Sequence, residues 1–373
     1  MPATATRITV VGSPALPRGF LPTGVAPARR VYLCPIGPFS GGGLAFSACQ
    51  VLVRREREIL QTTASVDDIR EWSRAEGTAV GAYVCGVLER LATPLPPFAG
   101  LALDRPRIMG IVNVTPDSFS EDGETKDAAS AIARGRAMLV AGADIIDVGG
   151  ESARPGAAPL ATAEELARVR PVVRELAETG AVVSIDSRHA EIMKAALEGG
   201  ARIVNDITAL AGDAAALGVV AASRAAVVLM HMQGTPETMQ DDPRYENAAL
   251  DVYDELAARV AVCTAAGIET RRIAVDPGIG FGKTLDDNLE ILDRLALFRG
   301  LGCAVLLGAS RKSFLGSLAG GTPATARLFG SLAAALAAVA RGANIVRVHD
   351  VAETRQALDV WEAIGGRNGG AAP

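Results

Sequence analysis

The sequence predicts an α/β fold, a closed (β/α)8 TIM barrel preceded by a small N-terminal α+β region. Between residue 107 and the C-terminus, an apolar strand followed by a helical pattern recurs about eight times. The expected strands are almost wholly apolar, which is typical of a parallel sheet covered on both faces. Eight such units match a closed barrel, whose typical length is ~250 residues. An open, doubly wound sheet is the alternative.

Each expected strand is a short apolar run that ends in polar residues, and each expected helix has apolar residues three and four apart. The strands are expected at 108–112, 144–148, 182–186, 202–205, 226–230, 272–275, 304–307 and 344–348. The helices are expected at 127–141, 163–178, 189–199, 213–223, 247–266, 286–298, 325–341 and 353–364.

Polar residues gather where these strands end. In a closed barrel the carboxyl ends of all strands face one mouth, where enzymes of this fold keep their active sites. The strand ends carry Asn113, Asp147 with Glu151 and Arg154, Asp186, Asn205 with Asp206, His231, Asp276, Ser310 to Lys312, and Arg347 with His349. The opposite ends lack such groups, so the sequence predicts one polar site at the mouth.

Eight motifs, in a fixed order from about residue 98 onward, carry a family resemblance. They are Met109–Ser120, Asp147–Gly156, Ser184–Ser187, Val204–Ile207, Met230–Gly234, Asp276–Lys283, Ser310–Ser313 and Arg347–Asp350. The chain resembles the dihydropteroate synthases of folate biosynthesis. The resemblance implies a transferase that joins 6-hydroxymethyl-7,8-dihydropterin diphosphate to p-aminobenzoate and releases pyrophosphate.

That reaction places negative charge on the leaving diphosphate, so cations are needed there. Arg347 and His349 are two residues apart on a strand and share one face, and Arg154 follows a Gly-Gly pair. The resemblance implies that these three residues and Asn113 bind the diphosphate. It also implies that Asn113 is the protein ligand of a Mg²⁺ cofactor, and that Arg154, Lys312, Arg347 and His349 are the catalytic residues.

The resemblance also implies the pterin site. The aminopyrimidinone edge of the pterin offers neighbouring N–H groups, which can donate hydrogen bonds to one carboxylate. Asp276 matches the position of that carboxylate in the family. Met230 and Phe281 are expected to pack on the ring faces. The implied pterin-binding residues are Asp186, Asn205, Met230, Asp276, Phe281 and Lys312.

The second loop departs from the family pattern. Ser152, Ala153 and Ser313 are expected on the arylamine side, but the family usually has Thr or Ser where this chain has Ala153. The family is a target of sulfonamides, and this change leaves open whether the present chain is sensitive to them. Two alternatives also remain open: a pterin-binding methyltransferase domain and a catalytically weakened pterin-binding module.

Residues 1–97 lie outside the resemblance and are expected to form an accessory region of unknown function, separate from the barrel domain at 98–373. Strand-like runs occur at 7–11, 30–35 and 45–53, and a helix-like run at 66–92. The segment Thr93–Pro97 is rich in proline and marks the boundary. This region has no phosphate-binding glycine loop, so no fused kinase is expected.

Composition restricts the partners of the 373-residue chain. A formal net charge of −5 gives no basic patch for nucleic acid. Five cysteines without a CxxC pair indicate free thiols in a reducing cytoplasm. The first residues do not have the basic and apolar pattern of a signal segment, so a cytoplasmic protein is expected. The apolar run Leu328–Ala340 is shorter than the ~20 residues that span a membrane. We expect small-molecule substrates and, from the resemblance, a homodimer formed through late helices.

Overall fold

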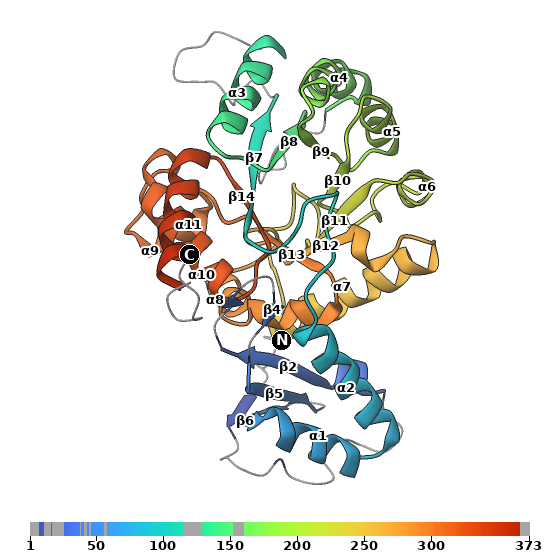
Figure 1. The fold of residues 1–373 in the computed structure, drawn as a ribbon, viewed down its shortest axis with the longest axis vertical. Helices are drawn as coiled ribbons and strands as arrows, with labels where there is room; N and C mark the ends of the chain where they lie inside the picture. The colour runs from blue at the N-terminus through green and yellow to red at the C-terminus, as the bar shows by residue number, and fades with distance from the viewer. Residues whose placement is uncertain are drawn as a thin grey trace.

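The computed structural model is a closed barrel with a smaller unit attached at one side (Figure 1). It describes residues 7–10, 16, 26–37, 39–40, 43–44, 46–55, 58–114, 128–151 and 160–365. Eight parallel strands close in the order β10-β11-β12-β13-β14-β7-β8-β9. The predicted TIM barrel is therefore confirmed, and the open sheet is excluded.

The barrel strands are short and buried, as their apolar sequences predict. They are β7 (Arg107–Asn113), β8 (Ile145–Gly149), β9 (Val182–Asp186), β10 (Ile203–Asp206), β11 (Ala226–Met230), β12 (Ile273–Asp276), β13 (Ala304–Leu307) and β14 (Ile345–Val348). The helices around them are α3 (Ala128–Val140), α4 (Thr162–Glu178), α5 (Ala190–Glu198), α6 (Ala216–Ala222), α7 (Ala248–Ala265), α8 (Leu285–Asp293), α10 (Leu328–Ala340) and α11 (Val351–Gly365).

Two of the predicted helices contain a 3-10 segment. The run predicted at 286–298 ends as an α-helix at Asp293 and continues as the 3-10 helix η4 (Leu295–Leu301). The run predicted at 325–341 begins with the 3-10 turn η5 (Ala324–Ala326), and α10 starts only at Leu328. A further short helix, α9 (Ser313–Leu318), follows β13 and was not predicted.

The amino-terminal end of the barrel is closed by the segment that leads into it. Phe98 and Leu103 pack with inward-facing strand residues such as Met109, Ile145 and Ile345 in one buried cluster. Phe98 and Leu101 are joined by backbone hydrogen bonds in both directions. Because apolar side chains fill this end, polar groups can gather only at the opposite mouth.

The N-terminal region forms a four-stranded sheet in the order β1-β6-β5-β2. Its elements are β1 (Arg7–Val10), the 3-10 turn η1 (Pro27–Arg29), β2 (Val31–Ile36), β5 (Ala48–Arg54), β6 (Glu58–Ser65), α1 (Val66–Ala75) and α2 (Thr78–Ala92), with a two-stranded β3 (Phe39–Ser40) and β4 (Gly43–Leu44). Strand β6 was not predicted. The single helix predicted at 66–92 is wrong, because Gly77 has a φ of 117° that no continuous helix can contain.

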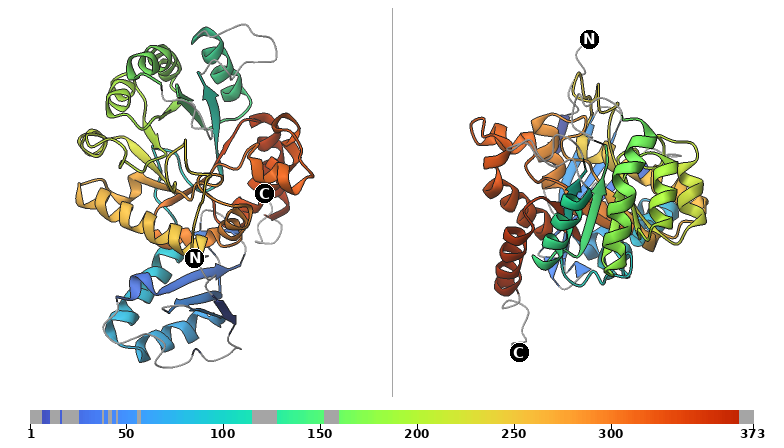
Figure 2. Two further views of the ribbon diagram at one scale, coloured as in Figure 1. Left: turned by 180° about the vertical axis from the view of Figure 1, so that it is seen from behind. Right: turned by 90° about the horizontal axis from the view of Figure 1, so that it is seen from above.

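This region packs against η4 through α2 and β2, and it meets α7 through side chains of β2 and β5 (Figure 2, left). Arg54 forms ion pairs with Asp251 at 2.5 Å and Asp254 at 3.3 Å. The Tyr32 hydroxyl donates to Asp254 at 2.8 Å, and its ring meets Tyr253 edge-on. The contact combines buried apolar surface with partly buried charges.

Candidate functional site

The polar ends of neighbouring strands form a row across the mouth. The strand register places Asn113 beside Gly149, Gly149 beside Asp186, and Asp186 beside Asn205. Farther around the barrel, Met230 pairs with Asp276. The structure therefore brings together groups that the sequence separates by more than 150 residues.

Asp147 is an acid of the mouth with no exposed surface. Its Oδ2 accepts a hydrogen bond from Asn205 Nδ2 at 3.0 Å and one from Arg347 Nε at 2.6 Å. Asp147 was expected at a strand end, but no role was predicted for it. Its position at the end of an apolar strand, like that of Asp186, was the available signal.

Arg347 is held from two sides. Its Nη2 donates to Asp186 Oδ2 at 2.7 Å, in addition to the bond from Nε to Asp147. Burial raises the pKa of Asp186, and the guanidinium of Arg347 opposes that shift. The two carboxylates keep Arg347 charged and fix the direction of its planar guanidinium.

Asp276 lies at the end of β12 and is almost fully buried. Its Oδ1 accepts from the backbone N–H of Gly278 at 2.8 Å, and burial raises the pKa of the carboxyl. Gly278 has a φ of 68°, and a Cβ there would lie 1.9 Å from the His231 carbonyl oxygen and 3.3 Å from Met230 Cγ. The turn after Asp276 thus depends on glycine and packs against Met230.

Lys312 approaches Asp276 from the loop after β13. Its Nζ donates to the carbonyl of Ile279 at 2.7 Å and lies 3.9 Å from the centre of the Phe281 ring. Burial lowers the pKa of Lys312 to about 7, and the nearby Asp276 opposes the shift. A cation held on a ring face fits the aromatic and charged character expected of the pterin end.

His349 was expected to be a second cation of the site, but its surroundings favour the neutral imidazole. Its Nδ1 lies 3.1 Å from Ser310 Oγ, and burial, reinforced by Arg347 and Arg311, lowers its pKa to about 3. The imidazole is therefore neutral at physiological pH. Ser313, expected on the arylamine side, begins α9 and is exposed.

Asn113 ends β7 and is half-buried. A Cβ on Gly149 would lie 3.6 Å from Asn113 Oδ1 and 3.5 Å from Asp186 Cβ. Glycine at this position keeps space free beside the amide oxygen, a hard, neutral donor of the kind that Mg²⁺ takes. The residues present therefore fit a magnesium ion here.

Three of the predicted site residues lie outside the described part of the chain. Ser152, Ala153 and Arg154 belong to the segment between β8 and α4, of which residues 152–159 are not described. Their expected roles on the arylamine and diphosphate sides stay predictions.

A buried lysine was missed by the sequence reasoning. Lys283 Nζ lies 3.0 Å from His231 Nδ1 and donates to the Phe281 carbonyl at 2.9 Å. His231 Nε2 lies 3.1 Å from Glu255 Oε2. Burial lowers the pKa of Lys283 to about 7. Lys283 ties the turn that carries Phe281 to the end of β11.

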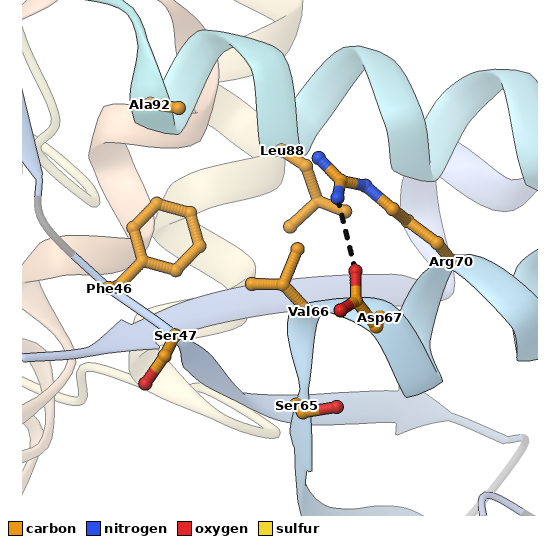
Figure 3. Close-up of a pocket in the computed structure, with 8 residues that line it drawn as sticks. All are labelled: Phe46, Ser47, Ser65, Val66, Asp67, Arg70, Leu88 and Ala92. Atoms are coloured by element: carbon orange, nitrogen blue, oxygen red, sulfur yellow. Dashed lines mark hydrogen bonds and ion pairs between the residues drawn. The ribbon is translucent and has the colours of Figure 1, made fainter.

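A separate hollow of about 400 Å³ lies in the N-terminal region, away from the mouth (Figure 3). Phe46, Val66 and Leu88 form its apolar lining, and the ion pair between Arg70 and Asp67 lies at its rim. It brings together no acid, base or nucleophile arrangement like that of the barrel mouth. Among the described residues, no helix has both the length and the apolar character needed to cross a bilayer.

Comparison with known proteins agrees with this geometry. The sequence model of the pterin binding enzyme family matches residues 109–349. The chain is 49% identical over 268 residues to dihydropteroate synthase from Neisseria meningitidis serogroup C, covering 71% of this chain and 95% of that protein. Dihydropteroate synthase from Xanthomonas albilineans, solved with 4-aminobenzoic acid, superposes with a TM-score of 0.68 at 45% identity, covering 74% of this chain and 97% of that one. The Yersinia pestis dihydropteroate synthase, solved as a sulfonamide drug complex, superposes with a TM-score of 0.68 at 42% identity. The match covers 71% of this chain and 96% of that one.

Proposed function

The chain belongs to the pterin-binding enzymes and, among them, to the dihydropteroate synthases, and from that premise we propose which residues carry the reaction. The activity is the condensation of 6-hydroxymethyl-7,8-dihydropterin diphosphate with p-aminobenzoate to 7,8-dihydropteroate and pyrophosphate. The arylamine nitrogen bonds to the pterin methylene carbon and loses a proton. The carbon–oxygen bond breaks, and its electron pair leaves with the diphosphate.

Asp276 is proposed to bind the aminopyrimidinone edge of the pterin. Its carboxylate is buried, and a Cβ on Gly308 would lie 3.9 Å from its Oδ2, so glycine leaves space beside the acceptor. Lys312 and Phe281 lie together on one side, where a ring carbonyl and a ring face can be met. Asp186, Asn205 and Met230 are the remaining proposed pterin contacts.

Arg347 is proposed to stabilise the charge that develops on the leaving diphosphate. Asp147 and Asp186 occupy its Nε and Nη2, which leaves the donors of Nη1 for the substrate. Because the guanidinium is already oriented, little reorganisation is required during the reaction. Arg154 is proposed as the second cation, and neutral His349 as a hydrogen-bond donor or acceptor beside the phosphates.

Magnesium is proposed at Asn113. When bound, the ion would neutralise part of the negative charge of the diphosphate. The amide oxygen of Asn113 and the space kept by Gly149 support this site. We also propose that the Mg²⁺ site requires the diphosphate for tight binding, because one neutral oxygen is a weak ligand set.

We further propose a homodimer, a cytoplasmic location and inhibition by sulfonamides. Large apolar side chains are exposed on the adjacent helices α10 and α11, namely Phe329 at 82%, Val360 at 55% and Ile364 at 65%. Sedimentation of Phe329→Glu should show a loss of dimer, whereas a dimer of unchanged stability would place the interface elsewhere.

All five cysteines are free, which suits the reducing compartment that we propose.

The buried Asp276 beside Lys312 and Phe281 is the observation that carries the proposed site. Pyrophosphate release from the dihydropterin diphosphate and p-aminobenzoate tests it, together with calorimetry of pterin binding. Asp276→Asn would place an amide donor opposite the pterin donors, at a cost of about 1–3 kcal/mol. The matched control is Asp359→Asn on α11, whose side chain is 62% exposed. Unchanged pterin affinity in Asp276→Asn would refute the assignment, and no turnover by the parent would favour a weakened module.

A further inference from the structure

A second cluster of ionisable side chains lies outside the barrel mouth. Glu151 follows β8, Glu165 lies in α4, and His189 immediately precedes α5. One ligand atom from each of the three lies within 4.8 Å of the others. None of the three has a part in the reaction proposed above.

Glu165 is the unusual member of this cluster. Its side chain has no exposed surface, and neither carboxylate oxygen accepts a hydrogen bond of ordinary geometry. The Ser187 hydroxyl is near enough to lower the pKa of Glu165, but burial outweighs it and raises the pKa. A buried carboxylate without partners is costly unless it pairs with a charge or binds a metal. His189 and Arg188 act on Glu165 only at a distance, because neither donates a hydrogen bond to its carboxylate.

Glu151 has one free position, and that position faces the cluster. Its Oε1 accepts from Arg188 Nη2 at 3.0 Å and from the Leu160 backbone N–H at 3.1 Å, while Oε2 accepts only from Arg188 Nε at 3.0 Å. A carboxylate offers about four lone pairs. The fourth belongs to Oε2, which is the oxygen that lies 3.9 Å from His189 Nε2.

The spacing suits an ion better than a direct bond. His189 Nε2 lies 3.9 Å from Glu151 Oε2 and 4.0 Å from Glu165 Oε2, both too long for hydrogen bonds. Ligands of one tetrahedral zinc ion, with bonds of about 2.0–2.2 Å, lie roughly 3.3–3.6 Å apart. The two distances from His189 exceed that separation by a few tenths of an ångström, and all three atoms lie within 4.8 Å of one another, so side-chain adjustment of about 1 Å or less brings them to one ion.

We propose that Glu151, Glu165 and His189 bind one divalent transition-metal ion of the Zn²⁺ class. Two carboxylate oxygens and an imidazole nitrogen are ligands for zinc, whereas Mg²⁺ prefers oxygen alone. The ion would place a positive charge in direct contact with the buried carboxylate of Glu165. Arg188 pairs with Glu151 through two hydrogen bonds, from Nε and Nη2, and would keep both when the ion is bound.

The site lies at the base of the segment between β8 and α4. Glu151 precedes residues 152–159, and its bond from the Leu160 N–H ties the two ends of that segment together. An ion on Glu151 would join this base to α4 through Glu165 and to α5 through His189. It would therefore be structural and distinct from magnesium at Asn113.

Zinc binding to the full-length protein tests the proposal. The measurements are the metal content after dialysis against Zn²⁺ with excess Mg²⁺, and calorimetric titration with Zn²⁺. Cys85→Ser serves as the background, because Cys85 is the exposed cysteine of the chain. His189→Asn removes a ligand whose side chain is 28% exposed, so the fold should tolerate it. His349→Asn is the matched control, a histidine outside the cluster.

We expect one Zn²⁺ per chain in the background and in His349→Asn, and affinity lower by at least about tenfold in His189→Asn. Zn²⁺ should also raise the Tm of the background protein but not that of His189→Asn. Glu165→Gln, if it folds, should lose binding in the same way. Absence of stoichiometric zinc, or equal affinity in His189→Asn, would overturn the proposal.

Discussion

Replacing Asp147 by asparagine tests whether the buried acid is what orients Arg347. The carboxylate has no exposed surface and accepts from Asn205 Nδ2 at 3.0 Å and Arg347 Nε at 2.6 Å. Asparagine keeps the shape but removes the charge. If the asparagine Oδ1 accepts from Arg347 in place of the carboxylate Oδ2, the asparagine NH2 group takes the position of the other carboxylate oxygen, which could only accept. The variant therefore weakens the charge pair without opening a cavity.

The magnitude follows from the partners that remain. Removing one partner of a buried ion pair costs about 3–5 kcal/mol because a charge is left uncompensated. Asp186 still holds Nη2 of Arg347, and the Arg347 side chain is 20% exposed. We therefore expect the lower end of the range, about 3 kcal/mol of unfolding free energy.

Urea unfolding followed by circular dichroism gives the stability, and pyrophosphate release gives turnover. The control is Asp67→Asn, whose side chain is 93% exposed and pairs with Arg70. Such a surface pair contributes about 0–1 kcal/mol. Turnover should fall in Asp147→Asn and stay unchanged in Asp67→Asn. Stability within about 1 kcal/mol of the parent, together with normal turnover, would show that Asp147 does not orient Arg347.

Three other predictions concern Arg347, Lys312 and Arg54. Arg347→Ala should lower kcat by about 10²–10³-fold, as loss of one donor to a developing anion does; turnover within threefold would refute its role. The pKa of Lys312 is lowered to about 7, so above pH 7 the free enzyme holds Lys312 largely neutral. Binding of the anionic pterin diphosphate should raise that pKa and take up a proton near pH 8, which calorimetry in two buffers measures and Lys312→Met should abolish. Arg54→Met should cost about 1–2 kcal/mol, because Arg54 is partly buried between Asp251 and Asp254; hydrogen exchange of β2 and β5 should then increase, and unchanged exchange would contradict the docking contact.

The barrel could be predicted because local sequence and global fold agree. The strands predicted at 182–186, 226–230 and 304–307 have the same bounds in the structure. Each is a short, continuous apolar run between polar turns, and such runs are buried on both faces only in a covered parallel sheet. The helix predicted at 325–341 also forms, but only its apolar part, Leu328–Ala340, is α-helical.

The N-terminal region was less predictable because its pairing is not local. Strand β6 carries Glu58, Gln61 and two threonines, and its register with β1 spans 51 residues, from Arg7 to Glu58. Nothing in the β6 sequence alternates strongly enough to show which face is buried. Gly77 was visible, but a single glycine inside a helical pattern does not reveal a positive φ.

The location of the site was predictable, but its charges were not. Strand ends indicated the mouth, because the closed barrel brings all of them to one side. Arg347 was expected as a cation that binds the diphosphate, and its pairing with Asp147 and Asp186 was not predicted. His349 was expected to be a cation, and burial beside Arg347 leaves it neutral. A protonation state depends on burial and neighbours that only the tertiary structure supplies.

These pairings explain how a site for a highly charged substrate stays folded when empty. Unpaired cations at the mouth would repel one another and lower stability, as unmatched buried charges do. Asp147 and Asp186 balance Arg347, while burial lowers the pKa of Lys312 toward neutrality. An anionic substrate would then favour the protonated form of Lys312 and meet an Arg347 already in position. On the proposed roles, substrate binding would therefore draw a proton to Lys312 at the pterin end, so affinity would depend on pH through Lys312 rather than through Arg347.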